Sequence, residues 1–233
     1  MAKTPLILIP GTLCDDRLWG YQRKYLSDIA EVSICEVTKD DSISSLAHSI
    51  LEKAPEKFAL AGLSLGGIIS LEIMRLAPER VIKLALLDTN PNPPHPDQIA
   101  TWERFINMAN NGQFLDITIK HLLPILIHPD RRKDETLVST IIDMAKKIGK
   151  DGYINQLKAV MTRSDQRSIL STIACPTIVV VGKEDMVCPV HISEFLTESI
   201  PTAKLEIVDY SGHLITLEQS GKVSALLRDW LNS

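Results

Sequence analysis

Short apolar runs recur along the chain and are separated by stretches in which apolar residues repeat at helical spacing. Six runs are candidate strands, at residues 6–9, 32–37, 58–61, 84–87, 177–181 and 205–208. Most are continuously apolar, as is typical of parallel strands that are covered on both faces. Helical patterns occupy residues 19–30, 44–54, 65–76, 191–199 and 219–231. This alternation predicts a parallel sheet with right-handed crossover connections.

The alternation stops between residues 90 and 171. The segment opens with Pro91, Pro93, Pro94 and Pro96, which stiffen its exit from the sheet. Apolar stripes at helical spacing follow, and one of them ends at Gly149. We therefore expect residues 91–171 to form an all-helical cap, inserted into an α/β core made of residues 1–90 and 172–233. A separate helical domain is the alternative, but the strand pattern that resumes at residue 177 favours an insertion.

Composition and charge narrow the class of protein. Of the 233 residues, 45% are hydrophobic and 23% are charged, which is typical of a globular protein. The net charge of -4 argues against a nucleic-acid partner, because phosphate binding needs a basic face. No apolar run reaches the roughly 18 residues of a membrane helix, and the run at 6–9 is too short for a signal-peptide core. We therefore expect a cytoplasmic protein with no membrane partner.

The sharpest local signal is the sequence Gly62-Leu63-Ser64-Leu65-Gly66-Gly67, which follows a strand run and opens a helical pattern. This is the context of a G-x-S-x-G nucleophile elbow, in which a serine sits on a tight turn between glycines. Chance gives roughly 0.04 such matches in a chain of this composition, so the match is specific. A glycine-rich turn with a capping serine is the alternative. A phosphate loop is disfavoured because the Gly-Lys-Ser/Thr ending is missing.

A nucleophilic serine needs a base, and His213 is the best placed histidine. It follows the last strand run, at the edge of a parallel sheet where ligands bind. The other histidines lie on helical stretches, where we expect surface positions, or in the cap: His48, His191, His95, His121 and His128.

The base needs an orienting acid, and Asp185 follows the fifth strand run at the same edge of the sheet. Asp88, at the end of the fourth run, is the alternative, although we favour a loop-capping role for it. Glu184 is disfavoured because it should point away from its neighbour. The chain order is then Ser64, Asp185, His213, the nucleophile–acid–base order of the α/β-hydrolases.

With these residues the sequence resembles the α/β-hydrolase superfamily, and within it the small soluble enzymes of the carboxylesterase and enol-lactonase type. The resemblance spans essentially the whole chain and rests on the elbow at Ser64, the Gly-x-x-Asp segment at Asp185 and the Gly-His pair at 212–213. It implies an α/β-hydrolase fold with a reduced parallel sheet of about six strands and helices on both faces. The implied sheet order is second, first, third, fourth, fifth and sixth strand. Residues 161–165 also resemble a segment of capped hydrolases, in which the simplest interpretation of Arg163 is a tie between cap and core.

The resemblance further implies an oxyanion hole formed by the backbone N–H groups of Thr12 and Leu65. Pro10 stands where the family usually has histidine, which removes a hydrogen bond that would anchor this loop. The implied reaction is acyl transfer, with His213 taking the proton of Ser64 and water later releasing the acid. It needs neither a metal nor an organic cofactor, and the sequence has no zinc-type spacing and no Rossmann or P-loop motif.

Three functions are compatible with these residues. The first is a serine hydrolase that cleaves a small, mostly apolar carboxylic ester or lactone through an acyl-enzyme. The second keeps the triad but acts as a C–C hydrolase, thioesterase, amidase or perhydrolase. The third is a ligand-sensing protein with little turnover, and each is compatible with a homo-oligomer. Candidate apolar lining residues lie in the cap, where packing within the cap is the alternative role for most: Trp102, Phe105, Phe114, Leu122, Leu123, Ile125, Leu126 and Ile127.

The four cysteines show no C-x-x-C spacing and are expected to be free thiols. Cys14 lies beside the predicted oxyanion loop and Cys188 beside the predicted acid. Either could line the site or respond to oxidation, but an inert, small, buried side chain is the favoured interpretation.

Overall fold

The computed structural model describes residues 3–233, and six parallel strands form its single sheet. The strands are β1 (Thr4–Ile9), β2 (Ala30–Ile34), β3 (Phe58–Leu63), β4 (Val81–Leu87), β5 (Thr177–Gly182) and β6 (Ala203–Val208). Their order is β2-β1-β3-β4-β5-β6, and every neighbouring pair is parallel. The predicted fold class and the strand order implied by the resemblance are confirmed.

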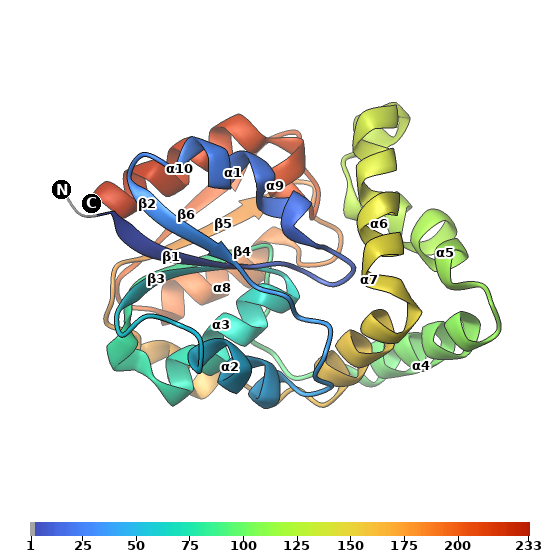
Figure 1. Cartoon of the computed structure of the whole chain (residues 1–233), viewed down its shortest axis with the longest axis horizontal. Coiled ribbons are helices and arrows are strands. Elements are labelled where there is room, and N and C mark those ends of the chain that lie inside the picture. The colour runs from blue at the N-terminus through green and yellow to red at the C-terminus, as the bar shows by residue number, and fades with distance from the viewer. Residues whose placement is uncertain (1–2) are drawn as a thin grey trace.

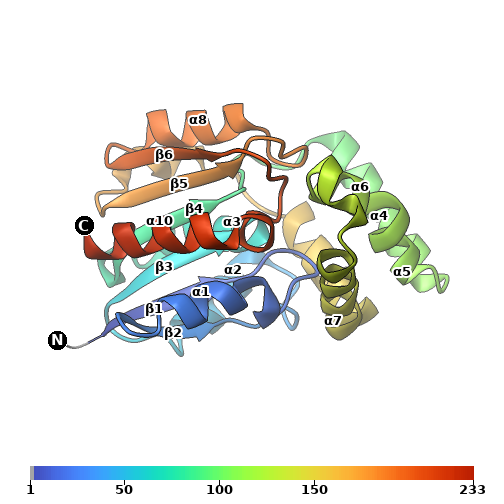
Figure 2. The ribbon, with the colours of Figure 1, turned by 90° about the horizontal axis from the view of Figure 1, so that it is seen from above.

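Helices cover both faces of the sheet, as Figures 1 and 2 show. One face carries α1 (Gly20–Tyr25) and α10 (Ser220–Asn232), and the other carries α2 (Ile43–Leu51), α3 (Leu65–Leu76) and α8 (Val190–Ser199). Successive side chains of β1 therefore enter opposite cores: Leu6 packs in the cluster that includes Leu227 of α10, and Ile7 in the cluster that includes Leu71 of α3. This double burial explains why the strands read as continuous apolar runs.

Between β4 and β5 the chain forms helices and turns, which we call the helical insertion. Its helices are α4 (Pro96–Asn110), α5 (Phe114–Asp116), α6 (Leu123–Leu126) and α7 (Glu135–Met161). Figures 1 and 2 show these helices beyond the carboxyl ends of the strands, on the side away from the C-terminus. Shorter helical elements complete the described chain: Asp16–Trp19, Pro78–Arg80, Ile117–Leu122, Pro129–Lys133, Arg167–Thr172 and α9 (Ile215–Glu218).

Several element boundaries differ from the sequence-based expectation, and three of these differences have a clear physical reason. The second strand covers Ala30–Ile34 instead of 32–37, because Val37 is buried in a loop and pairs with no strand. The helix expected at 19–30 ends at Tyr25, because the chain must turn to enter β2. The stripe predicted to end at Gly149 does break there, at φ 73° and ψ 169°, but helical structure resumes and continues to Met161.

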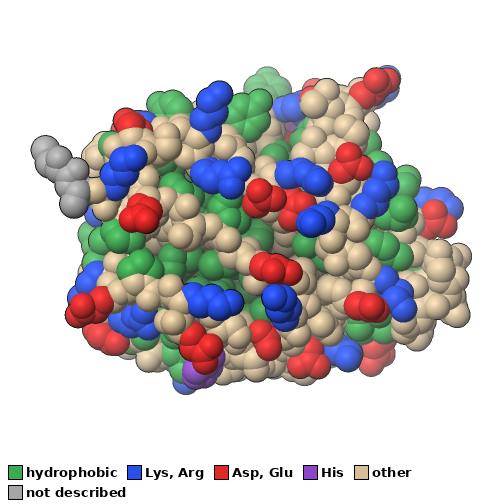
Figure 3. Space-filling view, viewed as in Figure 1, with side chains coloured by type: hydrophobic (Ala, Val, Ile, Leu, Met, Phe, Trp, Pro, Cys, Tyr) green, Lys and Arg blue, Asp and Glu red, His purple; other side chains and the backbone are tan. Residues whose placement is uncertain are grey.

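The surface carries charges of both signs. On the face drawn in Figure 3, basic and acidic side chains are interspersed over both the sheet region and the helical insertion. No helix within residues 3–233 combines the length and the apolar character needed to cross a bilayer.

Candidate active site

Ser64 occupies a sharp turn between β3 and α3. Its backbone has φ 55° and ψ −116°, a conformation that non-glycine residues rarely adopt and that a surrounding structure must enforce. The Ser64 N–H donates to the carbonyl of Leu87 at 3.0 Å, and its carbonyl accepts from the Thr89 hydroxyl at 2.7 Å. The ends of β3 and β4 thus hold the strained turn in place.

Two glycines make this turn sterically feasible. A Cβ atom on Gly62 would overlap the backbone of Gly66, and a Cβ atom on Gly66 would overlap the carbonyl of Ile9. These obstacles are backbone atoms, which cannot rotate away as a side chain can. The glycine requirement of the motif therefore has a direct structural cause: α3 begins in contact with β1 and β3.

The structure brings Ser64, His213 and Asp185 into one hydrogen-bonded chain. The distance from Ser64 Oγ to His213 Nε2 is 2.9 Å, and the distance from His213 Nδ1 to Asp185 Oδ2 is 2.8 Å. The other carboxylate oxygen of Asp185 accepts the backbone N–H groups of Val187 and Cys188 at 2.7 and 2.9 Å. Asp185 and His213 are both buried, so water does not compete for these bonds.

The surroundings of Asp185 keep it ionised. Burial by itself would raise the pKa of the carboxyl, but the attraction of His213 and the hydrogen bonds from His213, Cys188 and Val187 outweigh it and lower the pKa. An ionised Asp185 accepts Nδ1–H from the imidazole, which leaves Nε2 free to accept the Ser64 hydroxyl proton. The arrangement can therefore move a proton away from Ser64.

The two alternative acids support loops and do not contact His213. Asp88 Oδ1 accepts the Gly182 N–H at 2.9 Å, while Oδ2 has no partner within residues 3–233. Burial and the nearby charge of Asp185 raise the pKa of Asp88 well above its usual range, which favours the neutral form of this carboxyl. Glu184 accepts the N–H of Ser211 at 3.0 Å.

Two backbone N–H groups belong to residues that line the same cavity as Ser64. Thr12 and Leu65 both line the cavity described below, and neither N–H donates a hydrogen bond to another described residue. Leu65 is the first residue of α3, where the helix leaves its N–H groups unpaired and its dipole favours negative charge. These are the two groups that the family resemblance implies as oxyanion donors.

Gln156, a residue that sequence reasoning missed, anchors the loop that carries Thr12. Its Oε1 accepts the Leu13 N–H at 2.9 Å, and its Nε2 donates to the carbonyl of Val37 at 3.2 Å. Gln156 is fully buried on α7, so an element of the helical insertion replaces the anchor that Pro10 cannot supply. A polar residue beside Tyr153 and Leu157, within the apolar stripe of this helix, is the signal that could have revealed it.

The loop of His213 is also attached to the helical insertion. The His213 N–H donates to the carbonyl of Leu126 at 2.9 Å. The buried Glu218, also missed from the sequence, accepts the N–H groups of Gly212 at 2.9 Å and of His128 at 2.7 Å. Both loops that flank Ser64 are therefore fixed in part by contacts that the insertion supplies.

A cavity of about 420 Å³ lies between the carboxyl ends of the strands and the helical insertion. Ser64 and His213 open onto it, and this volume suits a small molecule. Five of the eight predicted apolar residues line it: Trp102, Phe105, Leu122, Ile125 and Leu126. The other three pack among hydrophobic neighbours instead: Phe114, Leu123 and Ile127.

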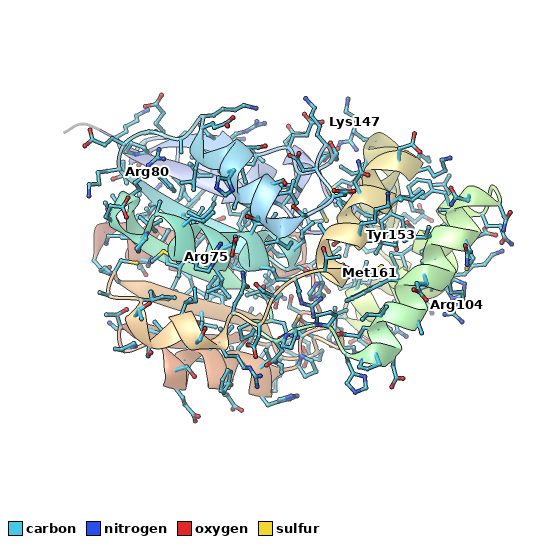
Figure 4. The ribbon with its side chains drawn as sticks, turned by 90° about the horizontal axis from the view of Figure 1, so that it is seen from below. Arg75, Arg80, Arg104, Lys147, Tyr153 and Met161 are labelled. Carbon is cyan, nitrogen blue, oxygen red and sulfur yellow. The ribbon has the colours of Figure 1, made fainter. Side chains whose placement is uncertain are left out.

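Figure 4 shows how α7 and α4 contribute side chains on the insertion side of the molecule. Tyr153 and Met161 are on α7 and Arg104 is on α4, whereas Arg75 and Arg80 lie in the α/β part of the chain. Tyr153 is buried and lines the cavity, and Arg104 is exposed.

All four cysteines are free, and two of them line the cavity. Burial raises the pKa of the Cys14 thiol to about 12, and burial with the nearby Asp185 raises that of Cys188 well above its usual value. Asp185, Cys188 and His213 place ligand-type atoms within 4.8 Å of one another. The first and last of these already bond each other, and the thiol is held protonated, so the group suits proton transfer better than metal binding.

Two curated relatives of this chain bear the names of hydrolases. The chain is 25% identical, over 86% of its length and 79% of the relative, to a putative carbamate hydrolase RutD of Pseudomonas savastanoi pv. phaseolicola. It is 23% identical, over 89% of its length and 87% of the relative, to a pimeloyl-[acyl-carrier protein] methyl ester esterase of Vibrio campbellii.

Solved structures show the same fold. A thermophilic esterase from Thermogutta terrifontis, with malate bound, superposes with a TM-score of 0.89 at 23% identity, covering 99% of this chain and 90% of that chain. The enol-lactonase from Burkholderia xenovorans LB400 superposes with a TM-score of 0.91 at 19% identity, covering 100% of this chain and 93% of that chain.

The family assignment rests on the larger part of the sequence. The profile of the alpha/beta hydrolase fold matches residues 36–220, which include the elbow and both of its hydrogen-bonded partners. The sequence-based prediction of an α/β-hydrolase enzyme is confirmed at this level. The chain belongs to the α/β-hydrolase fold family.

Proposed function

We propose that this protein is a serine hydrolase that cleaves a small carboxylic ester or lactone through an acyl-enzyme intermediate. The observation that carries the proposal is the chain of hydrogen bonds from Ser64 through His213 to Asp185, the first two of which line a mainly apolar cavity. The names of the relatives support it, because they describe hydrolysis of an ester, a lactone or a carbamate.

In the proposed mechanism, Oγ of Ser64 attacks the carbonyl carbon while Nε2 of His213 takes its proton. The imidazolium then gives that proton to the leaving alkoxide, and the acyl group stays on Ser64 as an ester. A water molecule repeats the cycle: it loses a proton to His213 and attacks the acyl carbon, and the imidazolium returns that proton to Oγ of Ser64 as the acyl–Oγ bond breaks and the carboxylic acid leaves. Asp185 holds the imidazole in the required tautomer and stabilises its charged form.

The oxyanion of each tetrahedral intermediate is received by the N–H groups of Thr12 and Leu65. Both donors are backbone groups that bond to no other described residue, so they need no reorganisation when charge develops. Removing one such donor typically costs about 3 kcal/mol of transition-state stabilisation.

The helical insertion acts as a cap in this proposal, with residues 91–171 inserted into a core of 1–90 and 172–233. It covers the cavity with apolar side chains from α4, α6 and α7. Exclusion of water strengthens the hydrogen bonds around Ser64 and selects substrates that fit a volume of about 420 Å³.

Intact-mass labelling by a fluorophosphonate tests the proposal, with wild type beside Ser64→Ala and with 4-nitrophenyl acetate and butyrate turnover in parallel. We expect one adduct on wild type, none on the variant, and hydrolysis of at least one ester. An adduct without ester turnover would shift the assignment to a C–C, thioester, amide or perhydrolytic reaction of the same serine. No adduct on the folded protein would refute an activated serine and favour a ligand-sensing role.

A further inference from the structure

Arg163 follows α7 and lines the cavity that contains Ser64. It is 7% exposed, and within residues 3–233 it is the only arginine that is buried. The proposed reaction assigns no role to this cation, because proton transfer and oxyanion binding are complete without it.

Three contacts fix the orientation of the guanidinium. Nε donates to the carbonyl of Asn92 at 2.9 Å, and Nη1 donates to the carbonyl of Val160 at 3.0 Å. The group lies over the ring of Trp102, with Cζ 5.4 Å from the ring centroid, a distance typical of a cation–π contact. These partners come from the entry of the insertion, from α7 and from α4, so the side chain is held from three directions.

Nη2 is the nitrogen of the Arg163 guanidinium that has no hydrogen-bond partner among the described residues. It donates no hydrogen bond to any described residue, yet it is not among the fully enclosed polar atoms without a partner, so it retains accessible surface. A tie between cap and core explains the bonds of Nε and Nη1. It does not explain an open donor on a residue that lines the cavity.

The charge of Arg163 has no counter-ion. Other arginines of the chain pair with carboxylates, among them Arg75 with Glu72 and Arg131 with Asp134. Arg163 forms no ion pair within the described part of the chain, and its protein partners are neutral carbonyls. Burial lowers its pKa, but a guanidinium stays protonated at neutral pH. A buried charge without a counter-ion is unfavourable, and a bound anion would supply the missing charge.

The acids near the cavity do not fill this role. Asp97 lines the cavity, but its side chain is 94% exposed and its neighbour is His95. Asp185 is engaged by His213, and Asp88 accepts the Gly182 N–H and forms no ion pair with Arg163. The remaining wall is mainly apolar, which suits an aliphatic chain between the reacting carbonyl and a terminal anion.

We propose that Arg163 binds a carboxylate of the substrate, so that the preferred substrate is a carboxylate-bearing ester or lactone, such as the monoester of a short dicarboxylic acid. The planar fork of arginine matches the two oxygens of a carboxylate, and Trp102 and the two carbonyls hold it ready for that contact. This inference rests on the proposed function, since it names the substrate class of the same serine.

Binding to the Ser64→Ala variant tests the inference without depending on turnover. Calorimetry compares the monomethyl esters of succinic, glutaric, adipic and pimelic acids with the corresponding dimethyl esters. We expect at least tenfold tighter binding of the monomethyl ester at one or more chain lengths. Adding Arg163→Met should reduce that preference to less than twofold, and adding Arg163→Lys should leave part of it, because the charge remains but the fork does not.

Arg104→Met, added to Ser64→Ala, is the matched control. Arg104 is also a cation of the insertion that lies over an aromatic ring, with Cζ 5.4 Å from the centroid of Phe105, but it is exposed and does not line the cavity. The preference should survive this substitution. Circular dichroism and thermal unfolding establish that each variant is folded. If Arg163→Met does not fold, the test compares the preference for the monomethyl ester in the protein that retains Arg163 with the preference in Arg163→Lys, which should be smaller.

Equal or weaker binding of the monomethyl ester at every chain length, or no binding at all, would overturn the inference. Loss of the preference in Arg104→Met to the same degree as in Arg163→Met would also overturn it, because a general charge effect would then suffice. Failure of the proposed function is recognised separately, by the absence of a fluorophosphonate adduct on the protein with Ser64 intact.

Discussion

The α/β core and the helical insertion contribute to the site in different ways. In the core, each member of the proposed triad follows the end of a strand: Ser64 follows β3, Asp185 follows β5, and His213 lies after β6. The insertion contributes no member of this chain of hydrogen bonds. It contributes supports, namely the side chain of Gln156 and the carbonyl of Leu126. The hydrogen-bonded chain is therefore encoded in the core alone, whereas its support comes from both parts of the sequence, with Thr89 and Glu218 on the core side.

This division has a physical basis. A parallel sheet fixes the carboxyl ends of its strands relative to one another through ladder hydrogen bonds, so groups placed there keep their distances. Loops beyond the sheet lack that ladder and need partners for their N–H groups, and here the insertion provides some of those partners, for the N–H groups of Leu13 and His213. Changes in the core should thus abolish the reaction, whereas changes in the insertion should weaken it by degrees.

The largest contrast should appear within the core itself, between its two buried aspartates. Asp185→Asn is expected to lower kcat roughly 10⁴-fold, because the amide no longer stabilises the required imidazole tautomer or its charged form. Asp88→Asn should stay within about threefold of wild type, since an amide oxygen can still accept the Gly182 N–H. Turnover of 4-nitrophenyl butyrate by both folded variants measures the contrast. The reverse ranking would transfer the acid role to Asp88.

A substitution in the insertion should have a smaller effect on the same reaction. Gln156→Leu removes the acceptor of the Leu13 N–H and leaves that buried group unpaired, so the loop that carries Thr12 loses its fixed position. We expect kcat to fall about 10- to 100-fold, less than the roughly 10²- to 10³-fold typical of deleting an oxyanion donor, with a smaller change in KM. Gln156→Glu keeps an acceptor and should retain more activity than Gln156→Leu. If Gln156→Leu were fully active, the insertion would not support the oxyanion loop.

The contrast between the core and the insertion also explains which site residues could be predicted from the sequence and which could not. The elbow and the positions of Asp185 and His213 follow from local strand and turn signals, and the sheet order follows from the resemblance that those signals support. Gln156 and Glu218 gave no such signal, because their roles depend on segments more than 80 residues away in sequence. The β2 boundary was missed for a related reason: Val37 is buried against neighbouring elements, and apolar patterning does not distinguish such a loop residue from a strand residue.

Two glycine substitutions compare the backbone of the insertion with that of the core. Gly149, at the kink of α7, has φ 73° and ψ 169°, a region nearly restricted to glycine, and an added Cβ would meet no atom within 4 Å. Gly149→Ala should therefore destabilise the protein by about 1–3 kcal/mol through backbone strain alone. Gly221, in α10, is equally open but has an ordinary helical backbone, so Gly221→Ala should stabilise by about 0.5–1 kcal/mol. Urea unfolding measures both, and destabilisation by both substitutions would show that steric crowding, not backbone conformation, governs these sites.

The smallest predicted effect is a change in how stability depends on pH. Burial raises the pKa of Asp88 in the folded protein, so the folded state holds this proton more tightly than the unfolded chain does. The contribution of Asp88 to stability is full below its pKa in the unfolded chain, about 4, and is lost as pH rises toward its pKa in the folded protein. Asp88→Asn removes this loss, so the free energy of unfolding of the variant should gain on wild type between pH 4 and 8.

Asp185→Asn supplies a control of opposite sign. The pKa of Asp185 is lowered in the folded protein, so wild type gains stability as pH rises through the interval below about 4, and the Asn variant lacks that gain. Urea unfolding of wild type and the two variants at a series of pH values measures the free energy of unfolding of each. As pH rises, Asp88→Asn should gain stability relative to wild type, and Asp185→Asn should lose stability relative to wild type. If both differences in unfolding free energy changed with pH in the same direction, Asp88 would be ionised in the folded protein. The core would then hold two charged carboxylates side by side, and the distinction between a catalytic Asp185 and a neutral, structural Asp88 would fail.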